Sequence, residues 1–105
     1  MRSTIFEFSQ EMALKKGLNP KDLLLLSYLF NWIQSGNVLF RWINKVEYFK
    51  ITYNKILKDL PIVFKNRLNI YRCLKKLEKS EVLKIYNDNQ KRLYVALNYN
   101  ALLAF

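Results

Sequence analysis

The segment from Lys50 to Tyr94 constrains the fold of this chain more than any other part of the sequence. A short helical pattern ends at Pro61, and a longer helical pattern rich in Lys and Arg follows it. Two runs of β-forming residues then lie on either side of a polar turn. The segment predicts helices over 53–60 and 65–79, strands over 82–86 and 92–97, and a turn over 87–90.

The longer helix has two unlike faces. At about 100° per residue, an apolar face forms on one side, and polar and cationic residues gather on the other. An ordinary solvated face would contain Glu for i,i+4 pairs, but the acid within this helix, Glu78, lies elsewhere. The apolar face contains Ile70, Tyr71, Leu74 and Leu77; the opposite face contains Lys65, Asn69, Arg72, Lys76 and Lys79, with Leu68 and Lys75 at its margin.

A second, strongly apolar helix is expected before this segment. Asn19 is a suitable N-cap, Pro20 suits the first helical position, and Gly36 is a suitable stop. The residues between them are apolar around nearly the whole circumference of a helix. Such a helix lies at the centre of a core, or one of its faces meets a second subunit.

The remaining segments give weaker patterns. The runs 38–43 and 46–51 predict a hairpin around Asn44-Lys45, although a helix through 38–46 is also compatible with the sequence. Near the N-terminus we expect a strand or extended arm over 5–8 and a helix over 10–16, capped by Ser9 and stopped by Gly17. Near the C-terminus we expect an apolar turn over 101–105, capped by Asn98 or Asn100. This turn would pack on the core or on a partner subunit.

This order of elements resembles winged helix-turn-helix domains, in particular small phage-type and plasmid-type domains linked to replication or regulation. The stretches that carry the resemblance are LNPKDLLLLSYLFNWI, YFKITYNKILKDLP, NIYRCLKKLEKSEVLKI and RLYVALNYNAL, which span about 18–103. It implies an α+β, mainly helical fold with a small antiparallel β-wing, and one such domain over 1–105. One departure is Glu81, which stands where these domains place a Gly in a left-handed turn into the wing.

The charge of the chain points to a polyanionic partner. Net charge is +10, and residues 41–92 hold fourteen basic and five acidic residues, a net of +9. A solubility surface, or a genome that favours Lys codons, is the alternative explanation. We expect two residues of the basic helix, Asn69 and Arg72, to contact base edges. Other DNA contacts are expected along the same helix, from Lys65, Lys75, Lys76 and Lys79. Further contacts are expected on the wing, from Lys84, Lys91 and Arg92, and at the start of the preceding helix, from Lys50, Thr52 and Lys55. Thr52 is explained equally well as a helix cap.

Four aromatic residues and one cysteine have competing explanations. Trp32, Trp42, Tyr48 and Phe49 suggest an aromatic cluster, which serves a core or dimer interface or else stacks on single-stranded bases. Cys73 lies towards the side of its helix and is a plain small side chain, or a redox switch if its cationic neighbours favour the thiolate.

Catalysis is not expected. The chain has no His, one Cys and two Gly, so it lacks the usual general base, a disulfide and a phosphate-binding glycine loop. We expect no enzyme activity, no cofactor, no metal, no small-molecule substrate, no membrane segment and a cytoplasmic location, in the nucleoid or in a host cell if the source is viral. The expected function is double-stranded DNA binding, as a homodimer, in transcription regulation or replication initiation of a phage, virus or plasmid. The alternatives are a protein-interaction module that binds a host protein and, more weakly, single-strand or RNA binding.

Overall fold

Helix α2 (Pro20–Gln34) is the central helix of the computed structural model, which describes residues 4–5, 8–9 and 15–103. A capping box starts it: Asn19 Oδ1 accepts the N–H of Asp22 at 3.0 Å, and Asp22 Oδ2 accepts the N–H of Asn19 at 3.0 Å. Pro20 occupies the first turn, and Gly36 lies beyond the end with φ +77°. The predicted helix and both of its terminal signals are confirmed.

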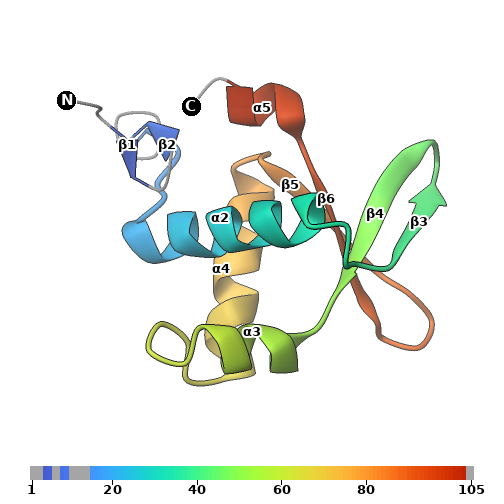
Figure 1. Cartoon of the computed structure of the whole chain (residues 1–105). Coiled ribbons are helices and arrows are strands. Elements are labelled where there is room, and N and C mark those ends of the chain that lie inside the picture. Colours follow the sequence, from blue (N-terminus) through green and yellow to red (C-terminus); the bar gives the residue numbers. More distant parts are fainter. Residues whose placement is uncertain (1–3, 6–7, 10–14, 104–105) are drawn as a thin grey trace.

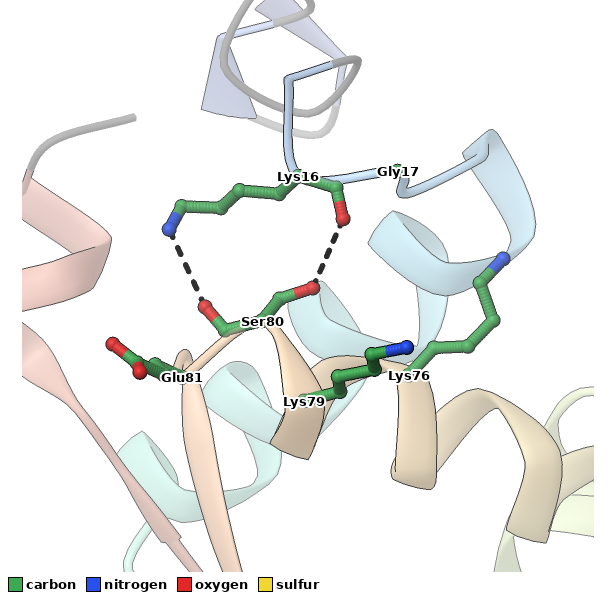
Figure 2. A pocket seen from close by; sticks show the side chains of 6 residues that line it. All are labelled: Lys16, Gly17, Lys76, Lys79, Ser80 and Glu81. Carbon is green, nitrogen blue, oxygen red and sulfur yellow. Dashed lines mark hydrogen bonds between the residues drawn. The ribbon is translucent and has the colours of Figure 1, made fainter.

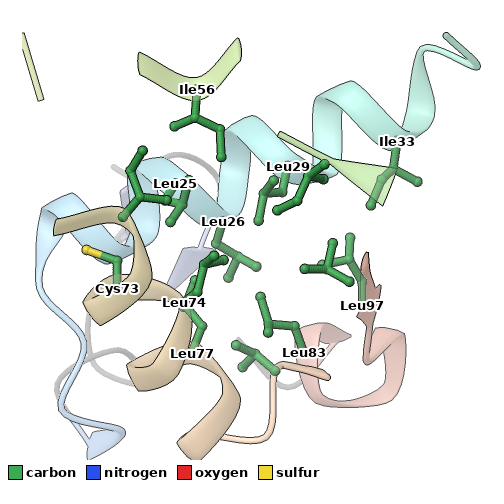
Figure 3. Packing of buried hydrophobic residues seen from close by; sticks show 14 of the residues in the cluster. Leu25, Leu26, Leu29, Ile33, Ile56, Cys73, Leu74, Leu77, Leu83 and Leu97 are labelled. Atoms are coloured by element: carbon green, nitrogen blue, oxygen red, sulfur yellow. The ribbon is translucent and has the colours of Figure 1, made fainter. Parts of the chain in front are cut away.

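The apolar circumference of α2 is buried in the core. Leu25, Leu26 and Leu29 point toward Leu74 and Leu77 of another helix (Figure 3), and all five side chains are inaccessible to solvent. Burying a leucine contributes roughly 1.5–3 kcal/mol, so this contact is a major source of stability.

The predicted hairpin is confirmed. Strands β3 (Phe40–Ile43) and β4 (Val46–Ile51) pair antiparallel, with Ile43 opposite Val46. Asn44 and Lys45 connect them with φ values of +50° and +66°, as a two-residue type I′ turn requires. The alternative of a continuing helix through 38–46 is wrong, because the chain reverses direction at this turn.

Helices α3 (Tyr53–Asp59) and α4 (Arg67–Lys79) follow, each with a side-chain cap. Thr52 Oγ1 accepts the N–H of Lys55 at 3.3 Å, and Asn66 Oδ1 accepts the N–H of Asn69 at 3.0 Å. The start of α4 at Arg67 corrects the predicted start at Lys65. Asn66 satisfies an end N–H of the helix, so Lys65 lies before α4, where its Nζ donates to the carbonyl oxygen of Pro61 at 3.1 Å.

The two strands that the sequence assigned to a wing are β5 (Leu83–Asn87) and β6 (Leu93–Leu97), each starting one residue later than predicted. Strand β6 pairs with both β5 and β4, so the sheet has the antiparallel order β3-β4-β6-β5 (Figure 1). The sequence predicted two separate hairpins. Their union into one sheet was not predicted, because it depends on the long-range pairing of Phe49 with Val95 and of Ile51 with Leu93.

The ends of the chain differ in part from expectation. Strands β1 (Thr4–Ile5) and β2 (Phe8–Ser9) pair with each other, so 5–8 is not one strand. The predicted helix over 10–16 falls mainly outside the described residues, and Gly17 has φ +72° as expected of its stop. Helix α5 (Tyr99–Leu103) starts earlier than predicted because Asn98 is the cap: its Oδ1 accepts the N–H of Ala101 at 3.2 Å.

The connection from α4 to β5 is a Schellman turn that contains Glu81. The N–H of Val82 donates to Leu77 O at 3.2 Å, and the N–H of Glu81 donates to Glu78 O at 3.0 Å. Glu81 has φ +65°, the left-handed conformation that Gly adopts at low cost. Leu77 and Val82 are fully buried beneath the turn. The turn from α4 into β5 therefore forms with Glu81 at the left-handed position.

We predict that Glu81→Gly stabilises the protein by about 0.5–1 kcal/mol, because the relief of left-handed strain exceeds the added freedom of Gly in the unfolded chain. Gly36→Ala is the matched control, since Gly36 also has a positive φ. It should lower stability by about 1 kcal/mol. Urea denaturation measures both free energies of unfolding, and a loss of stability in Glu81→Gly would contradict the strain at this turn.

Candidate nucleic-acid interface

The exposed face of α4 is rotated about the helix axis by roughly 50° from the predicted face, which is half of the 100° between successive residues. Cys73 is buried with Ile70, Leu74 and Leu77, whereas Tyr71, predicted to be buried, is 46% exposed. A small thiol is readily buried, and a tyrosine tolerates exposure through its hydroxyl. The outward face consequently centres on Leu68, Arg72, Lys75 and Lys79.

Two residues of the predicted stripe lie at its margin. Lys76 Nζ lies 2.5 Å from Asp22 Oδ2, and the Asp22 side chain is completely buried. Asn69 is half-buried, and its backbone N–H is used by the cap of α4. Lys75 pairs with Glu78 at 2.7 Å on an exposed surface, where such a pair is weak. Arg72 and Lys79 are exposed and form no ion pair within the described part of the chain.

A basic groove lies beside the N-terminal end of α4. We define it by Lys50, Arg67, Lys91 and Arg92, which come from β4, α4 and the β5–β6 connection and line a space of about 300 Å³. Asp88 pairs with Arg92 from outside this space. The other lining residues are neutral. They are Ile51, Thr52, Tyr53, Asn54 and Leu93.

Arg67 is the member of the groove that sequence reasoning missed. Its guanidinium donates to Asn54 Oδ1 at 3.2 Å and lies 5.9 Å from the centre of the Tyr53 ring. Both contacts are made to α3, so the side chain is held between the two helices. The sequence signal that could have found it is its place directly after the cap Asn66, in the first turn of α4.

The tip of the wing is ordered by Asp88. Its Oδ1 accepts the N–H groups of Gln90 at 2.9 Å and Arg92 at 2.8 Å, and its Oδ2 lies 3.1 Å from the Arg92 guanidinium. Burial alone would raise the pKa of Asp88, but these N–H groups and the charges of Arg92 and Arg41 outweigh it and hold the pKa below its usual value. Arg92 is therefore fixed at the groove rather than free in solvent.

The structure does not bring every predicted contact to this interface. Thr52 caps α3, as the alternative explanation held. Lys55 pairs with Asp59 at 2.9 Å and lies 5.1 Å from the Trp32 ring centre. Lys84 lies toward the other end of β5, opposite Ala96. Of the predicted residues outside α4, Lys50, Lys91 and Arg92 supply cations to the groove, and Thr52 lines it while it caps α3.

A second depression, of about 470 Å³, lies at the C-terminal end of α4 (Figure 2). Lys16 Nζ donates to the carbonyl oxygen of Ser80 at 3.3 Å, and Ser80 Oγ donates to the carbonyl oxygen of Lys16 at 3.1 Å. Lys76 and Lys79 also line it. The reciprocal bonds fasten the segment before α2 to the end of α4, which gives Lys16 a structural role.

Cys73 is not placed to act as a redox switch. Burial, and then the neighbouring Asp22 carboxylate, raise the pKa of its thiol to about 12, against a smaller opposing effect of Lys21 and Lys76. The thiol therefore stays protonated at neutral pH, and a protonated thiol is a poor nucleophile. The explanation as a small buried side chain is favoured.

The predicted aromatic cluster does not form. Trp32 packs near Tyr28 on α2, Tyr48 near Tyr86, and Phe49 near Phe40, with ring centres about 6 Å apart in each pair. Trp42 is 64% exposed at the sheet edge. These residues were grouped because they are close in sequence, but they lie on α2 and on opposite faces of the sheet.

In residues 4–5, 8–9 and 15–103, no helix combines the length and apolarity needed to cross a membrane, and no three His, Cys, Asp or Glu side chains gather as a metal site. The chain matches no family model, no curated protein and no solved structure. Its function is therefore inferred from its own residues.

We predict that Lys76→Met destabilises the protein by about 3 kcal/mol, because it leaves the buried charge of Asp22 without a partner. Lys75→Met is the matched control on the same helix, and removing its exposed pair should change stability by less than about 0.5 kcal/mol. The double variant Asp22→Asn with Lys76→Met should recover part of the loss. Equal effects of the two single lysine changes in urea denaturation would contradict the importance of the buried pair.

We also predict that native protein at pH 8 reacts with iodoacetamide at Cys73 far more slowly than urea-unfolded protein, because the thiol is both buried and protonated. Mass spectrometry over time measures the alkylated fraction. Comparable native and unfolded rates would show that the thiol is accessible.

Proposed function

We propose that this chain is a winged helix-turn-helix domain that binds double-stranded DNA. The observation that carries the proposal is the basic groove, in which four cations from three elements converge beside the exposed cationic face of α4. No lining residue is acidic, and Asp88 pairs with one of the four cations, Arg92. Clustered cations on adjoining elements are the electrostatic footprint of a phosphate-binding surface.

The order of elements supports the same proposal. Helices α3 and α4 are joined by a short turn and contact each other, β5 and β6 follow, and β4 completes the sheet beside β6. A winged helix-turn-helix domain has this order, and its second helix enters the major groove. The β3–β4 hairpin adds an edge strand to that arrangement.

In the proposed mechanism α4 reads the sequence and the groove holds the backbone. Arg72 is suited to a guanine edge, and the exposed Leu68 is suited to a thymine methyl group. Lys79 and the groove cations contact phosphates, which sets the register of the helix on the duplex. Affinity then falls steeply with salt, since each phosphate contact releases counterions.

The biological role we propose is transcription regulation or replication initiation in a phage, virus or plasmid, without enzymatic activity. This assignment follows from the resemblance of the core pattern to such domains.

One alternative function has an observation in its favour. Leu39, Phe40 and Trp42 are 71%, 56% and 64% exposed along the sheet edge, with Leu39 on the opposite face from the two aromatic side chains, and exposed apolar residues of this kind suit a protein-interaction module. A module of that kind would bind a protein partner and show no duplex affinity.

We predict that Arg72→Gln with Lys79→Gln weakens duplex binding at least tenfold and lowers the slope of log affinity against log salt by about one, as expected for the lost phosphate contact of Lys79. The control Lys45→Gln with Lys84→Gln removes the same charge from the far end of the sheet and should change affinity less than threefold.

Fluorescence anisotropy with a randomised duplex pool, and with a single strand and an RNA as competitors, measures both quantities. Equal losses of affinity in the two double variants would show that the loss comes from net charge alone. Tighter binding to the single strand than to the duplex would overturn the assignment. Lys76 is left unchanged because its substitution would disturb folding through Asp22.

A further inference from the structure

Strand β3 is an unprotected edge of the sheet. The order β3-β4-β6-β5 leaves its outer side without a neighbour among the described strands. Leu39, Phe40 and Trp42 stand there with more than half of their area in solvent. Edge strands are usually guarded by charge, by Pro or by a bulge, because their unpaired backbone groups invite another strand. Here Arg41 is the single charged residue of β3.

The backbone N–H and C=O groups of successive residues at this edge point alternately toward β4 and away from it. The N–H of Lys50 donates to the carbonyl oxygen of Leu39 at 2.8 Å, so Leu39 and, by alternation, Arg41 turn their backbone groups toward β4. Phe40 and Trp42 consequently turn their N–H and C=O groups outward. A strand added to this edge must bond to these two residues.

We propose that the occupant of this edge is β3 of a second copy of the chain, paired antiparallel about a two-fold axis at Arg41. In this register Phe40 faces the partner's Trp42, and Trp42 faces the partner's Phe40, each pair with outward backbone groups. Leu39 faces the partner's Ile43 on the other side of the sheet. Every exposed apolar side chain of the edge thereby meets an apolar partner, and aromatic cross-strand pairs are favourable.

The two neighbouring two-fold registers are less favourable. With the axis at Phe40, Leu39 would face the partner's Arg41, and only one aromatic pair would remain instead of two. The other register lies on the opposite side. Two opposed residues must both turn their backbone groups toward the partner strand or both turn them away, so this register places the axis at Trp42. Phe40 would then face the partner's Asn44, and Leu39 would face Lys45 of the partner subunit. The apolar complementarity therefore selects the axis at Arg41.

The positive charge of Arg41, which lies at the two-fold axis, is bound by groups of its own copy. Two Arg41 residues would lie opposite each other, which costs free energy between like charges. The guanidinium of Arg41, however, lies 5.4 Å from the Tyr94 ring centre and 3.9 Å from Asp88 Oδ2, on the side of β6. Each Arg41 is thus drawn away from the axis toward its own wing.

The area available predicts a weak dimer. An aromatic residue buries on the order of 150–250 Å², so the exposed parts of four aromatic residues and two leucines amount to on the order of 800 Å². Stable interfaces bury about 1,200 Å² or more. The association is therefore expected to be weak and to depend on protein concentration. Because each copy has a charge of +10, added salt should strengthen it, opposite to the effect of salt on DNA binding.

The dimer has a consequence if the proposed DNA binding holds. A two-fold axis perpendicular to the sheet keeps both α4 helices on the same side of the joined sheet. Such a dimer is suited to a DNA site with inverted repeats. The dimer itself does not depend on DNA and is measured without it.

Sedimentation velocity of the full chain over a range of protein and salt concentrations tests the proposal. We expect concentration-dependent dimers that tighten with salt, and at least tenfold weaker association in Trp42→Lys. Ile62→Lys, which alters another exposed apolar residue (88% exposed), should dimerise normally. Thermal denaturation should show both variants folded, since both positions are on the surface.

Cross-linking then tests the register. Opposed residues without mutual backbone bonds have Cα atoms about 4.5 Å apart, within disulfide range. Arg41→Cys should form an intermolecular disulfide under mild oxidation, whereas Lys45→Cys should not, and the buried Cys73 gives no background. A wild-type monomer at all concentrations, a Trp42→Lys dimer, or equal cross-linking at both positions would each overturn the proposal. Loss of duplex binding alone would leave it standing.

Discussion

Asp22 is the buried charged residue among the described side chains, and the relative placement of the two main helices depends on it. Its Oδ2 completes the capping box of α2 and pairs with Lys76 of α4, and the Cys73 thiol lies close by. A buried carboxylate is stable only when it is paired, so α2 and α4 are held in one rotational setting. That setting determines which face of α4 meets solvent.

The same interaction separates the cations of α4 by role. Lys76 neutralises Asp22, whereas Arg72 and Lys79 remain available on the outward face. A lysine on a cationic stripe is therefore not interchangeable with its neighbours. The distinction matters for any substitution, because a loss of binding on changing Lys76 would mix recognition with folding.

The sheet supplies the other half of the proposed surface. Pairing of β4 with β6 brings the end of β4 next to the wing tip, and so places Lys50 beside Lys91 and Arg92. The union also leaves β3 at an edge with its aromatic side chains exposed. One long-range pairing thus creates both the groove that we assign to DNA and the edge that we assign to a second copy.

Local signals in the sequence were sufficient for most of the elements. Asn19, Thr52 and Asn98 cap helices at predicted positions, and Asn44-Lys45 turns the predicted hairpin, because caps and tight turns need only nearby residues. The apolar period of α4 was also visible, although its burial was misjudged at Tyr71 and Cys73. Arg67 was missed, since nothing near it in sequence reveals that Asn54 and Tyr53 would hold it.

The sequence by itself determined the basic character of residues 41–92, the order of helices and strands, and the positions where most of them begin and end. Tertiary structure alone decided which cations converge in the groove, which lysine is paired with Asp22, and which strand is left at the edge. The physical reason is that capping and periodicity act over a few residues. Burial, ion pairing and strand order depend on contacts between distant segments, and local sequence patterns do not reveal which segments meet.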